Sequence, residues 1–347
     1  MQQFASDNNA GLCPEAMDAL IRANGTGHEI SYGDDRWTAA AKARIAEVFE
    51  RECEVYFVFN GTAANALALA AICRPYHAVL CHALSHVDTD ESGAPEFFTG
   101  GAKLMTADGA NGKLVPAAVD KLAGRWQGIH HVKARVLSLT QATELGTVYT
   151  TDEIGALAQA ARSHGLAVHM DGARLANAVA HLDCRPADMT WRAGVDVLSL
   201  GGTKNGLAVG EAVVFFARGL ADEFAWRVKQ SGQLASKMRF VTAPWLGLLE
   251  NDVWLSNARH ANAMARRLAK GIAGVPGVEL LYPVEANAVF ADIPPGVQTT
   301  LRAQGWQFYT FLGETGCRLM CAWDTAPETV DRFADAMQTA GKRAVAP

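Results

Sequence analysis

The sequence predicts an α/β protein, with a mostly parallel central sheet in a large domain and a smaller α+β domain at the C-terminal end. Short apolar runs alternate with helical stretches between residues 55 and 216, and this alternation is typical of a parallel sheet with helices on both faces. After Pro276 and Gly277 the pattern changes to short strand-like runs. The length of 347 residues also exceeds that of most single domains. We therefore expect an N-terminal segment and large domain over residues 1–250 and a small domain over residues 251–347.

The strands of the large domain are expected at short runs made mostly of apolar residues, because a parallel sheet buries both faces of its strands. Such runs fall at residues 55–59, 78–81, 135–139, 166–170 and 196–200. The first run is followed by an Ala- and Leu-rich stretch over residues 62–72, which predicts a helix. A second helix is predicted over residues 151–164, with Thr151 as its N-cap and Gly165 just beyond its end.

The small domain is expected to follow a long helix. A helical stretch over residues 250–270 is followed by Gly271, which we expect to end it. Strands are then predicted at residues 278–281, 287–293, 306–309 and 317–321. A helix over residues 327–340 completes this α+β arrangement.

The composition is typical of a soluble globular enzyme, with 50% hydrophobic and 19% charged residues. A net charge of −5 argues against nucleic acid and anionic lipid as partners. The longest apolar run, residues 63–73, is too short to span a membrane and contains Asn65. The seven cysteines are scattered, and the N-terminal residues lack the pattern of a signal peptide. These features predict a cytoplasmic protein.

Several common motifs are absent. The sequence has no Gly-x-Gly-x-x-Gly after a strand, no Walker loop, no His-Glu-x-x-His and no Gly-x-Ser-x-Gly. Their absence weakens the case for nicotinamide or nucleotide binding, for a zinc protease and for a serine hydrolase. No metal site is predicted.

Residues 60–65, Asn-Gly-Thr-Ala-Ala-Asn, lie between a predicted strand and a predicted helix. Gly61 lets the backbone approach a ligand, Thr62 offers a hydroxyl, and the helix N-terminus offers free N–H groups. Together these groups predict a cradle for a phosphate or another anion. The alternative is an ordinary strand–helix turn capped by Thr62.

Two further strand ends carry charged side chains. Asp171 ends the run at 166–170, and α/β folds place functional groups at such ends; the alternative is that Asp171 pairs with Arg174. Lys204 follows the run at 196–200 among small residues. In a tight pocket its amine would be desolvated and become a nucleophile, and the alternative is a solvated loop lysine.

His86 lies in the segment 82–91, after the run at 78–81 and beside three carboxylates. A histidine in this place could stack on a planar ring or move a proton. The alternative is a polar loop with a structural histidine.

Taken together, these segments predict one site for pyridoxal 5′-phosphate (PLP). A phosphate cradle, then Asp171, then Lys204 across the next strand is the order that PLP enzymes of the aminotransferase-like fold use. In this chemistry a lysine forms a Schiff base with the cofactor aldehyde. A carboxylate keeps the pyridine nitrogen protonated, so that the ring can take up electrons as a bond to Cα breaks.

The chain resembles the low-specificity L-threonine aldolases, within the wider group of β-eliminating lyases, nearly from end to end. The matching motifs are Ser6-Asp7-Asn8, Tyr32-Gly33-Asp34-Asp35, Gly61-Thr62-Ala63-Ala64-Asn65, the spacing of His86 and Glu91, Asp171-Gly172-Ala173-Arg174, and Lys204. The resemblance implies the type I fold of PLP-dependent transferases.

The resemblance also implies a role for each matching residue. Lys204 would form the Schiff base, Asp171 would contact the pyridine nitrogen and His86 would stack on the ring. The residues implied to bind the cofactor are Gly61, Thr62, His86, Asp171, Arg174, Thr203 and Lys204, with Lys229 and Lys237 reaching the phosphate of a neighbouring subunit. Those implied to bind the substrate are Ser6, Tyr32, Arg174 and Arg318.

One loop departs from the pattern of that family. Many members read Glu-Asn-Thr-His-Asn-Gly, whereas this chain has Thr-Gln-Ala-Thr-Glu-Leu-Gly at residues 140–146. The histidine that handles the substrate β-hydroxyl is therefore missing. Glu144, Thr143, His86 or a bound water are the alternatives for its role.

We therefore predict a carbon–carbon lyase that cleaves L-threonine, L-allo-threonine and related β-hydroxy-L-α-amino acids, phenylserine types included, to glycine and an aldehyde. The alternatives are β-elimination or transamination with the same cofactor, or a binding protein on this fold that lacks the cofactor. The resemblance further implies a homodimer as the minimum unit and a homotetramer as the expected one, because Tyr32 and Lys229 would serve the neighbour's site.

Overall fold

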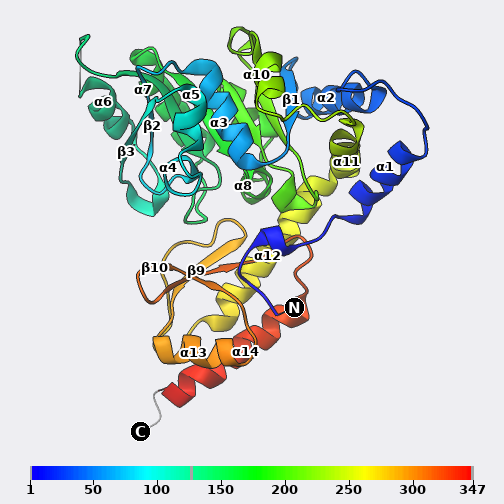
Figure 1. The fold of residues 1–347 in the computed structure, drawn as a ribbon. Coiled ribbons are helices and arrows are strands. Elements are labelled where there is room, and N and C mark those ends of the chain that lie inside the picture. Colours follow the sequence, from blue (N-terminus) through cyan, green and yellow to red (C-terminus); the bar gives the residue numbers. More distant parts are fainter. Residues whose placement is uncertain (1, 126–127, 345–347) are drawn as a thin grey trace.

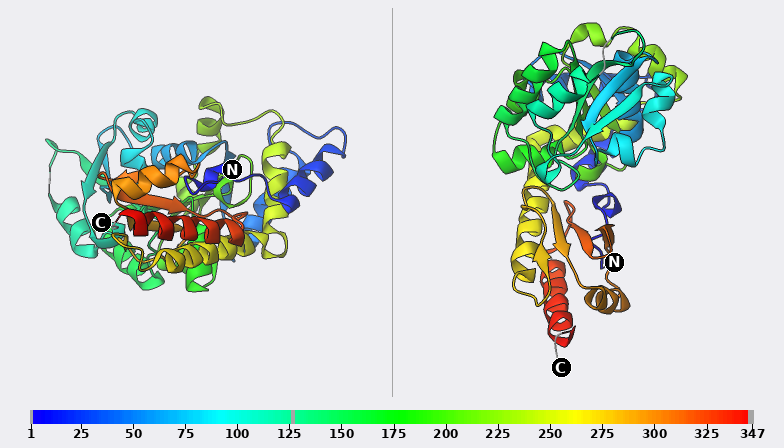
Figure 2. Two further views of the ribbon diagram at one scale, coloured as in Figure 1. Left: turned by 90° about the horizontal axis from the view of Figure 1, so that it is seen from below. Right: turned by 90° about the vertical axis from the view of Figure 1, so that its left-hand side faces the viewer.

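Two lobes make up the structure, a computed structural model that describes residues 2–125 and 128–344. The large lobe is built on a seven-stranded sheet and the small lobe on a four-stranded sheet. Helix α12 (Val253–Ile272) runs from one lobe into the other (Figure 1), so that Trp254 packs in the core of the large lobe and Leu268 in that of the small lobe. In the side view the lobes lie end to end (Figure 2).

The large sheet is mostly parallel, as predicted. Its strands, in the order in which they lie side by side, are β1 (Glu54–Val58), β7 (Glu211–Phe215), β6 (Val197–Leu200), β5 (Ala167–Gly172), β4 (Lys133–Thr140), β2 (His77–His82) and β3 (Lys103–Ala107). Only β7 runs antiparallel to its neighbours within this sheet. Because β7 is reversed, its first residue lies at the edge where β1 and β6 end.

The apolar strand residues alternate between two hydrophobic clusters, one on each face of the sheet. Along β2, Ala78 and Leu80 pack in the cluster that contains residues of helices α7 (Thr151–Ser163) and α8 (Leu175–Leu182). Val79 and Cys81 pack in the cluster that contains residues of helix α3 (Gly61–Ile72). This burial on both faces explains why the strand sequences are continuously apolar.

The helices of the large lobe cover both faces of the sheet (Figures 1 and 2). They are α1 (Pro14–Asn24), α2 (Arg36–Val48), α3 (Gly61–Ile72), α4 (His86–Thr89), α5 (Ala94–Thr99), α6 (Pro116–Gly124), α7 (Thr151–Ser163), α8 (Leu175–Leu182), α9 (Pro186–Met189), α10 (Phe224–Gln230) and α11 (Arg239–Leu249). None of the helices in the described part of the chain is long and apolar enough to cross a bilayer.

Two predicted helix ends are wrong by one or two residues. The N-cap of α7 is Thr150 and not Thr151, because the Thr150 hydroxyl accepts from the N–H of Glu153 and the Glu153 carboxylate accepts from the N–H of Thr150. Gly271 does not end α12, which continues to Ile272. A Cβ at Gly271 would lie 2.7 Å from the Cβ of Ala334, so this glycine lets α14 approach α12.

The small lobe is an antiparallel sheet with two further helices. Its strands lie in the order β10 (Tyr309–Leu312), β11 (Gly316–Met320), β9 (Ala288–Asp292) and β8 (Glu279–Leu280), and its helices are α13 (Pro295–Ala303) and α14 (Pro327–Ala344). The strand predicted at 306–309 begins later, at Tyr309. Trp306 and Phe308 are instead buried in the core of the lobe, where they pack against Phe333.

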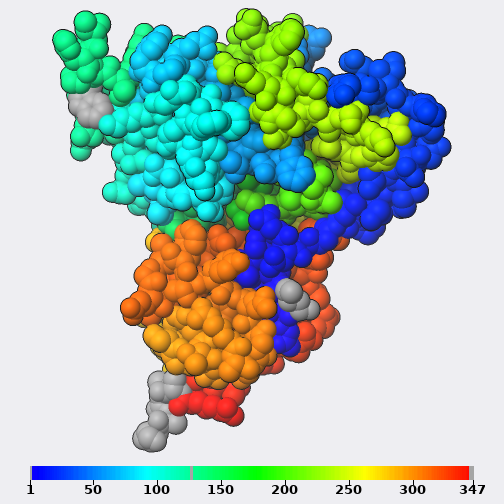
Figure 3. Space-filling view, viewed as in Figure 1, coloured from blue at the N-terminus to red at the C-terminus, as the bar shows by residue number. Residues whose placement is uncertain are grey.

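The N-terminal segment lies between the lobes (Figure 3). Phe4 is buried in the core of the small lobe, its N–H donates to the carbonyl of Gln307, and its carbonyl accepts from the N–H of Met320. A 3-10 helix, η1 (Asp7–Asn9), then leads towards α1 in the large lobe. The domain boundary at 250/251 stays a prediction, although Asn251, with φ of 50°, makes a kink just before α12.

Candidate active site

A cavity of about 470 Å³ lies at the edge of the large sheet where β1, β5 and β6 end. Its lining includes Gly61, Thr62, Asp171, Lys204 and Glu211. We call it the strand-end cavity. The sheet therefore brings together the three segments that the sequence singled out as a phosphate cradle, a carboxylate and a lysine.

The N-terminus of α3 forms one wall of the strand-end cavity. The side chain of Asn60, the N-cap, accepts from the N–H of Ala63 at 2.9 Å. The cap is thus Asn60 and not Thr62, which the sequence offered as an alternative. In the described part of the chain, the N–H groups of Gly61 and Thr62 have no acceptor, and a Cβ at Gly61 would meet nothing within 4 Å. This end of the helix is open to an anion.

Asp171 is buried at the end of β5 and does not pair with Arg174. Its Oδ2 accepts from Nδ2 of Asn65 at 2.8 Å, and its Oδ1 accepts from the N–H of Ala173 at 3.0 Å. The alternative of an Asp171–Arg174 pair is therefore wrong. The carboxyl group bonds to neutral donors and lines the cavity, which leaves it able to accept from a ligand N–H.

His86 belongs to the same hydrogen-bonded chain. Its Nδ1 lies 2.8 Å from Oε1 of Glu91, and this oxygen also accepts from Nδ2 of Asn65 at 2.8 Å. Asn65 thus links the carboxylates of Glu91 and Asp171. The hydrogen bond with Glu91 raises the pKa of His86, and burial raises the pKa of Glu91.

Lys204 is presented by a short 3-10 helix, η4 (Thr203–Asn205), directly after β6. Two glycines make this turn possible. A Cβ at Gly201 would lie 2.4 Å from the carbonyl oxygen of Ala173, and a Cβ at Gly202 would lie 2.6 Å from Cδ1 of Leu207. The tight turn directs Lys204 to the boundary of the strand-end cavity and a second cavity.

This second cavity, of about 380 Å³, lies between the lobes, and we call it the interlobe cavity. Its lining includes Ser6 of the N-terminal segment, Glu144 and Arg174 of the large lobe, and Arg318 of the small lobe. The two cavities share Asn8, His86, Asp90 and Lys204, so they adjoin at the lysine.

The two arginines of the interlobe cavity differ in their partners. Arg174 forms a bidentate ion pair with Asp7, whereas Arg318 has no carboxylate within 4.0 Å in the described chain. Nε of Arg318 is buried and lacks a hydrogen-bond acceptor. Burial, and next the charge of Arg174, lower the pKa of Arg318. A buried cation without a counter-ion is unfavourable, so this position is suited to an anionic ligand.

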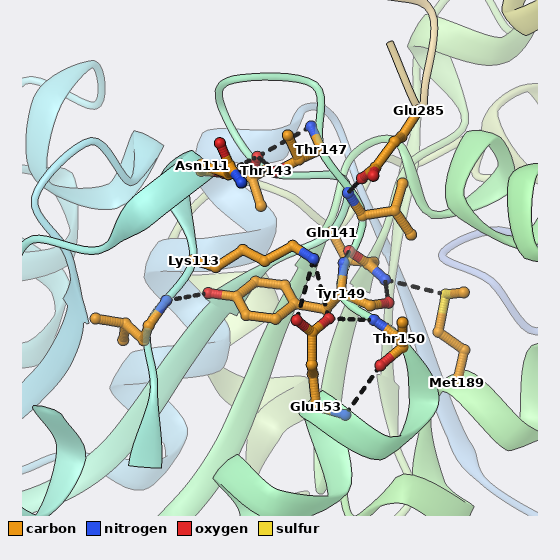
Figure 4. Close-up of polar contacts among 12 residues, drawn as sticks. Asn111, Lys113, Gln141, Thr143, Thr147, Tyr149, Thr150, Glu153, Met189 and Glu285 are labelled. Atoms are coloured by element: carbon orange, nitrogen blue, oxygen red, sulfur yellow. Dashed lines mark hydrogen bonds and ion pairs between the residues drawn. The ribbon is translucent and has the colours of Figure 1, made fainter. Parts of the chain in front are cut away.

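Glu144 is held by a closely hydrogen-bonded loop (Figure 4). Nε2 of Gln141 donates to the carbonyl of Tyr149 at 2.8 Å, and the N–H of Tyr149 donates to Oε1 of Gln141 at 3.1 Å. The carboxylate of Glu285 accepts from the N–H of Val148. The Thr143 hydroxyl bonds with that of Thr147 at 2.7 Å (Figure 4) and not with the cavity.

The buried position of Glu144, and next the negative charge of Asp171, raise the pKa of its carboxyl. Of the side chains proposed to replace the missing histidine, Glu144 and His86 line the interlobe cavity and Thr143 does not.

Three predicted site residues lie away from both cavities in their own chain. Tyr32 and Lys229 contact each other, with the Lys229 amine 4.7 Å from the ring centroid, and Lys237 lines a separate cavity beside Glu29. A position away from the cavities of their own chain is what we expect of residues that complete the site of a second subunit. Their role in such a site stays a prediction.

The residues around Lys204 fit a flat cofactor that carries a phosphate. The open N-terminus of α3 and the hydroxyls of Thr62 and Thr203 suit the phosphate, Asp171 suits a ring N–H, and the imidazole of His86 suits a ring face. The amine of Lys204 suits an aldehyde.

Sequence reasoning missed three polar residues of the site. Asn65 was read only as part of the cradle motif, although its spacing of four residues from Gly61 places it on the same face of α3. The ion pair of Asp7 with Arg174 could not be predicted, because the two residues are far apart in sequence. Glu211 begins an otherwise apolar strand, and a carboxylate at such a position is a signal that could have been used.

Comparison with known proteins agrees with this geometry. The family model of beta-eliminating lyases matches residues 3–294. A low specificity L-threonine aldolase of Pseudomonas aeruginosa is 57% identical over 333 residues, 96% of each chain. The structure of a Leishmania major threonine aldolase is similar with a TM-score of 0.91 and 29% identity, over 99% of each chain.

The fold itself is shared more widely. An aspartate aminotransferase of Rhodobacter sphaeroides gives a TM-score of 0.71 at 16% identity, over 98% of this chain and 93% of that chain. This likeness confirms the predicted aminotransferase-like fold. The motifs, the full-length identity and the family match together show that the chain belongs to the beta-eliminating lyase family.

Proposed function

We propose that this chain is a PLP-dependent aldolase that cleaves L-threonine, L-allo-threonine and related β-hydroxy-L-α-amino acids to glycine and an aldehyde. The names of its full-length relatives support this activity. The observation that carries the proposal is Arg318, a partly buried guanidinium with a buried, unpartnered Nε and no carboxylate within 4.0 Å in the described chain, in a cavity that adjoins Lys204. An α-amino acid would bring a carboxylate to that cation and an amine to the lysine.

The strand-end cavity would hold the cofactor. The N–H groups of Gly61 and Thr62 would bind the phosphate together with the hydroxyls of Thr62 and Thr203, and Lys204 would hold the aldehyde in covalent linkage. When bound, the cofactor supplies an electron sink for the pair of electrons released as a bond to Cα breaks. Asp171 would keep the ring nitrogen protonated, and His86 would cover one face of the ring.

The interlobe cavity would orient the amino acid. Arg318 would take the substrate carboxylate, and Arg174, whose Nε and Nη2 are engaged by Asp7, would add charge beside it. The Ser6 hydroxyl, whose oxygen accepts from the N–H of Asn8, still has its proton to donate. Charge-assisted hydrogen bonds of this kind each contribute on the order of 1.5–3 kcal/mol. They would hold the Cα–Cβ bond perpendicular to the cofactor ring.

The β-hydroxyl proton would pass to Glu144. Its raised pKa makes this carboxylate a stronger base than an exposed one. Thr143 and Thr147, which lie on either side of it in the sequence, bond with each other and so restrain the loop (Figure 4). His86 is the other ionisable candidate in the cavity, but its Nδ1 is engaged by Glu91. We therefore assign the proton transfer to Glu144.

The assembly and location of the protein belong to the same proposal. The contact of Lys229 with Tyr32, away from the cavities of their own chain, supports a homodimer in which these residues and Lys237 complete the neighbour's site. A homotetramer would be a dimer of such dimers. The scattered, free cysteines support a cytoplasmic location.

The proposal is tested by incubating the PLP-loaded protein with L-threonine and with L-phenylserine. The products are then assayed both for glycine and aldehyde, which retro-aldol cleavage would give, and for ammonia and keto acid, which β-elimination would give. We expect glycine with acetaldehyde and glycine with benzaldehyde, in equal amounts. Ammonia with a keto acid would instead identify β-elimination. A protein that does not bind added PLP would overturn the proposal altogether.

A further inference from the structure

Glu211 is a buried carboxylate of the strand-end cavity that the proposed chemistry leaves without a role. It is the first residue of β7, only 7% exposed, and the remaining residues of that strand are apolar. Because β7 is antiparallel to its neighbours, Glu211 lies opposite Val58 at the end of β1. It therefore lines the strand-end cavity on the side next to Lys204.

The Glu211 carboxyl is bonded to the turn that carries the lysine. Its Oε2 accepts from the N–H of Gly202 at 2.5 Å. Burial raises the pKa of Glu211, while the neighbouring hydroxyl and N–H of Thr203 and the N–H of Gly202 act to lower it. One buried carboxylate thus holds the turn just before Lys204 through Gly202, with Thr203 beside it.

The opposite side of the same turn is held by neutral groups from other elements. Nδ2 of Asn205 donates to the carbonyl of Trp254, the carbonyl of Asn205 accepts from Nδ2 of Asn257, and the carbonyl of Gly206 accepts from the N–H of Cys13. These contacts anchor the turn after Lys204. The anchor before Lys204, on the cavity side, is Glu211.

We propose that Glu211 is a positioning residue of the cofactor site, which holds the turn at residues 202–204 so that the Thr203 hydroxyl and the Lys204 amine face the cofactor. This inference rests on the proposed function. It adds a residue that acts through Lys204 and Thr203 and does not itself touch the substrate. A carboxylate is suited to the task because it accepts several N–H and O–H donors at once.

The test compares three variants in their affinity for PLP. Glu211→Ala removes the acceptor, Glu211→Asp keeps the charge but shortens the reach by one methylene, and Glu211→Gln keeps an oxygen at the same distance. The cofactor-free proteins are titrated with PLP, and the visible absorption band reports binding. Loss of hydrogen bonds to a charged acceptor is expected to weaken binding by roughly 10- to 100-fold in the Ala and Asp variants. The Gln variant is expected to stay within about threefold of the wild type, because it retains an acceptor.

Asp196→Ala is the matched control. Asp196 also uses a carboxylate to accept a backbone N–H, that of Val168 at 2.8 Å, but at the opposite end of the sheet. It is expected to leave the PLP dissociation constant unchanged, whatever it does to the unfolding temperature of the cofactor-free protein.

Each result decides a different question. PLP affinity of Glu211→Ala equal to that of the wild type, or reduced only as much as in Asp196→Ala, would overturn the positioning role while the proposed function stands. If Glu211→Ala does not fold, the Asp and Gln variants decide: equal affinity in both would equally overturn it. A wild-type protein that binds no PLP would overturn both proposals.

Discussion

The guanidinium of Arg174 makes a bidentate contact with Asp7, with Nε 2.7 Å from Oδ2 and Nη2 2.9 Å from Oδ1. Nδ2 of Asn287 donates to the same carboxylate at 3.0 Å. Asp7 comes from the N-terminal segment, Arg174 from the large lobe and Asn287 from the small lobe. One buried carboxylate therefore joins three separate parts of the chain at the edge of the interlobe cavity.

Asp7→Asn should destabilise the protein. Although burial acts to raise the pKa of Asp7, the charge and hydrogen bonds of Arg174 hold it below its ordinary value of 3.8. The variant leaves a buried guanidinium unpaired, and we expect a loss of about 3–5 kcal/mol in the free energy of unfolding at pH 7. Urea titrations of the wild type and the variant measure this difference in the free energy of unfolding.

The difference between wild type and Asp7→Asn should also depend on pH. Because the native pKa is depressed, the contribution of Asp7 is fully present above 3.8 and is lost as the pH falls through the lower native value. Asp331→Asn is a control, since its bidentate pair with Arg267 is exposed. Equal effects of the two substitutions would contradict the interpretation.

Glu144→Gln should slow L-threonine cleavage by roughly 10²- to 10⁴-fold, the usual contribution of a positioned base. In the wild type, kcat should fall as the pH drops through the pKa of Glu144, which burial raises above its ordinary value of 4.5. The Gln variant should lose this acid limb. His86→Asn should keep it and move it to higher pH, because the charge of His86 lowers the pKa of Glu144. An unchanged limb in Glu144→Gln would exclude Glu144 as the base.

Asp171→Asn should leave PLP bound but reduce turnover. Without the carboxylate the ring nitrogen loses its proton and the ring becomes a poor electron sink. Breaking the charge pair between Asp171 and the ring nitrogen should cost ~3–5 kcal/mol, which corresponds to a loss of roughly 10²- to 10⁴-fold in rate. Steady-state kcat and a PLP titration separate the two effects. A kcat close to that of the wild type would refute the role of Asp171.

Lys204→Ala should abolish the visible band of the PLP-loaded protein and its trapping by borohydride, because no other lysine lines the two cavities in the described structure. Lys42→Ala is a control, as the Lys42 amine lies over the ring of Tyr56, outside the site. A single borohydride-reduced adduct that persists in Lys204→Ala would show that another lysine holds the cofactor.

The enzyme should be strict at Cα and permissive at Cβ. Inversion at Cα would separate the substrate carboxylate from Arg318 and leave a buried charge unpaired, so D-threonine should not be cleaved. At Cβ a single carboxylate, Glu144, would orient the hydroxyl under this proposal. We therefore expect a difference of only ~1–2 kcal/mol, which corresponds to a roughly 5- to 30-fold ratio between L-threonine and L-allo-threonine in kcat/KM. Cleavage of D-threonine at a comparable rate, or a preference beyond about a thousandfold between the L forms, would rule this out.

Much of the large lobe could be predicted because its signals are local. Strands β1, β2, β4, β5 and β6 are mostly apolar, and α3 follows β1 with its cap. The reversed direction of β7 cannot be predicted from its sequence, because an apolar run looks the same in a parallel and an antiparallel strand. The position of Glu211 beside Lys204 therefore could not be predicted either.

The parts of the site that escaped prediction depend on contacts that are distant in sequence. The pairing of Asp7 with Arg174 and the link from Asn65 to Asp171 arise only when the lobes and the sheet are assembled. The strand at Tyr309 was misplaced because Trp306 and Phe308, which look like strand residues, are drawn into the core of the small lobe. Burial overrode their local preference.

The docking of Phe4 onto Gln307 and Met320 ties together residues that are about three hundred positions apart. During synthesis on a ribosome, Phe4 must therefore stay without these partners until residues 307–320 have been made. The interlobe cavity, which needs both Ser6 and Arg318, can form only after that point. A nascent large lobe would accordingly have Lys204 and Asp171 in place before Arg318 is there to bind a carboxylate.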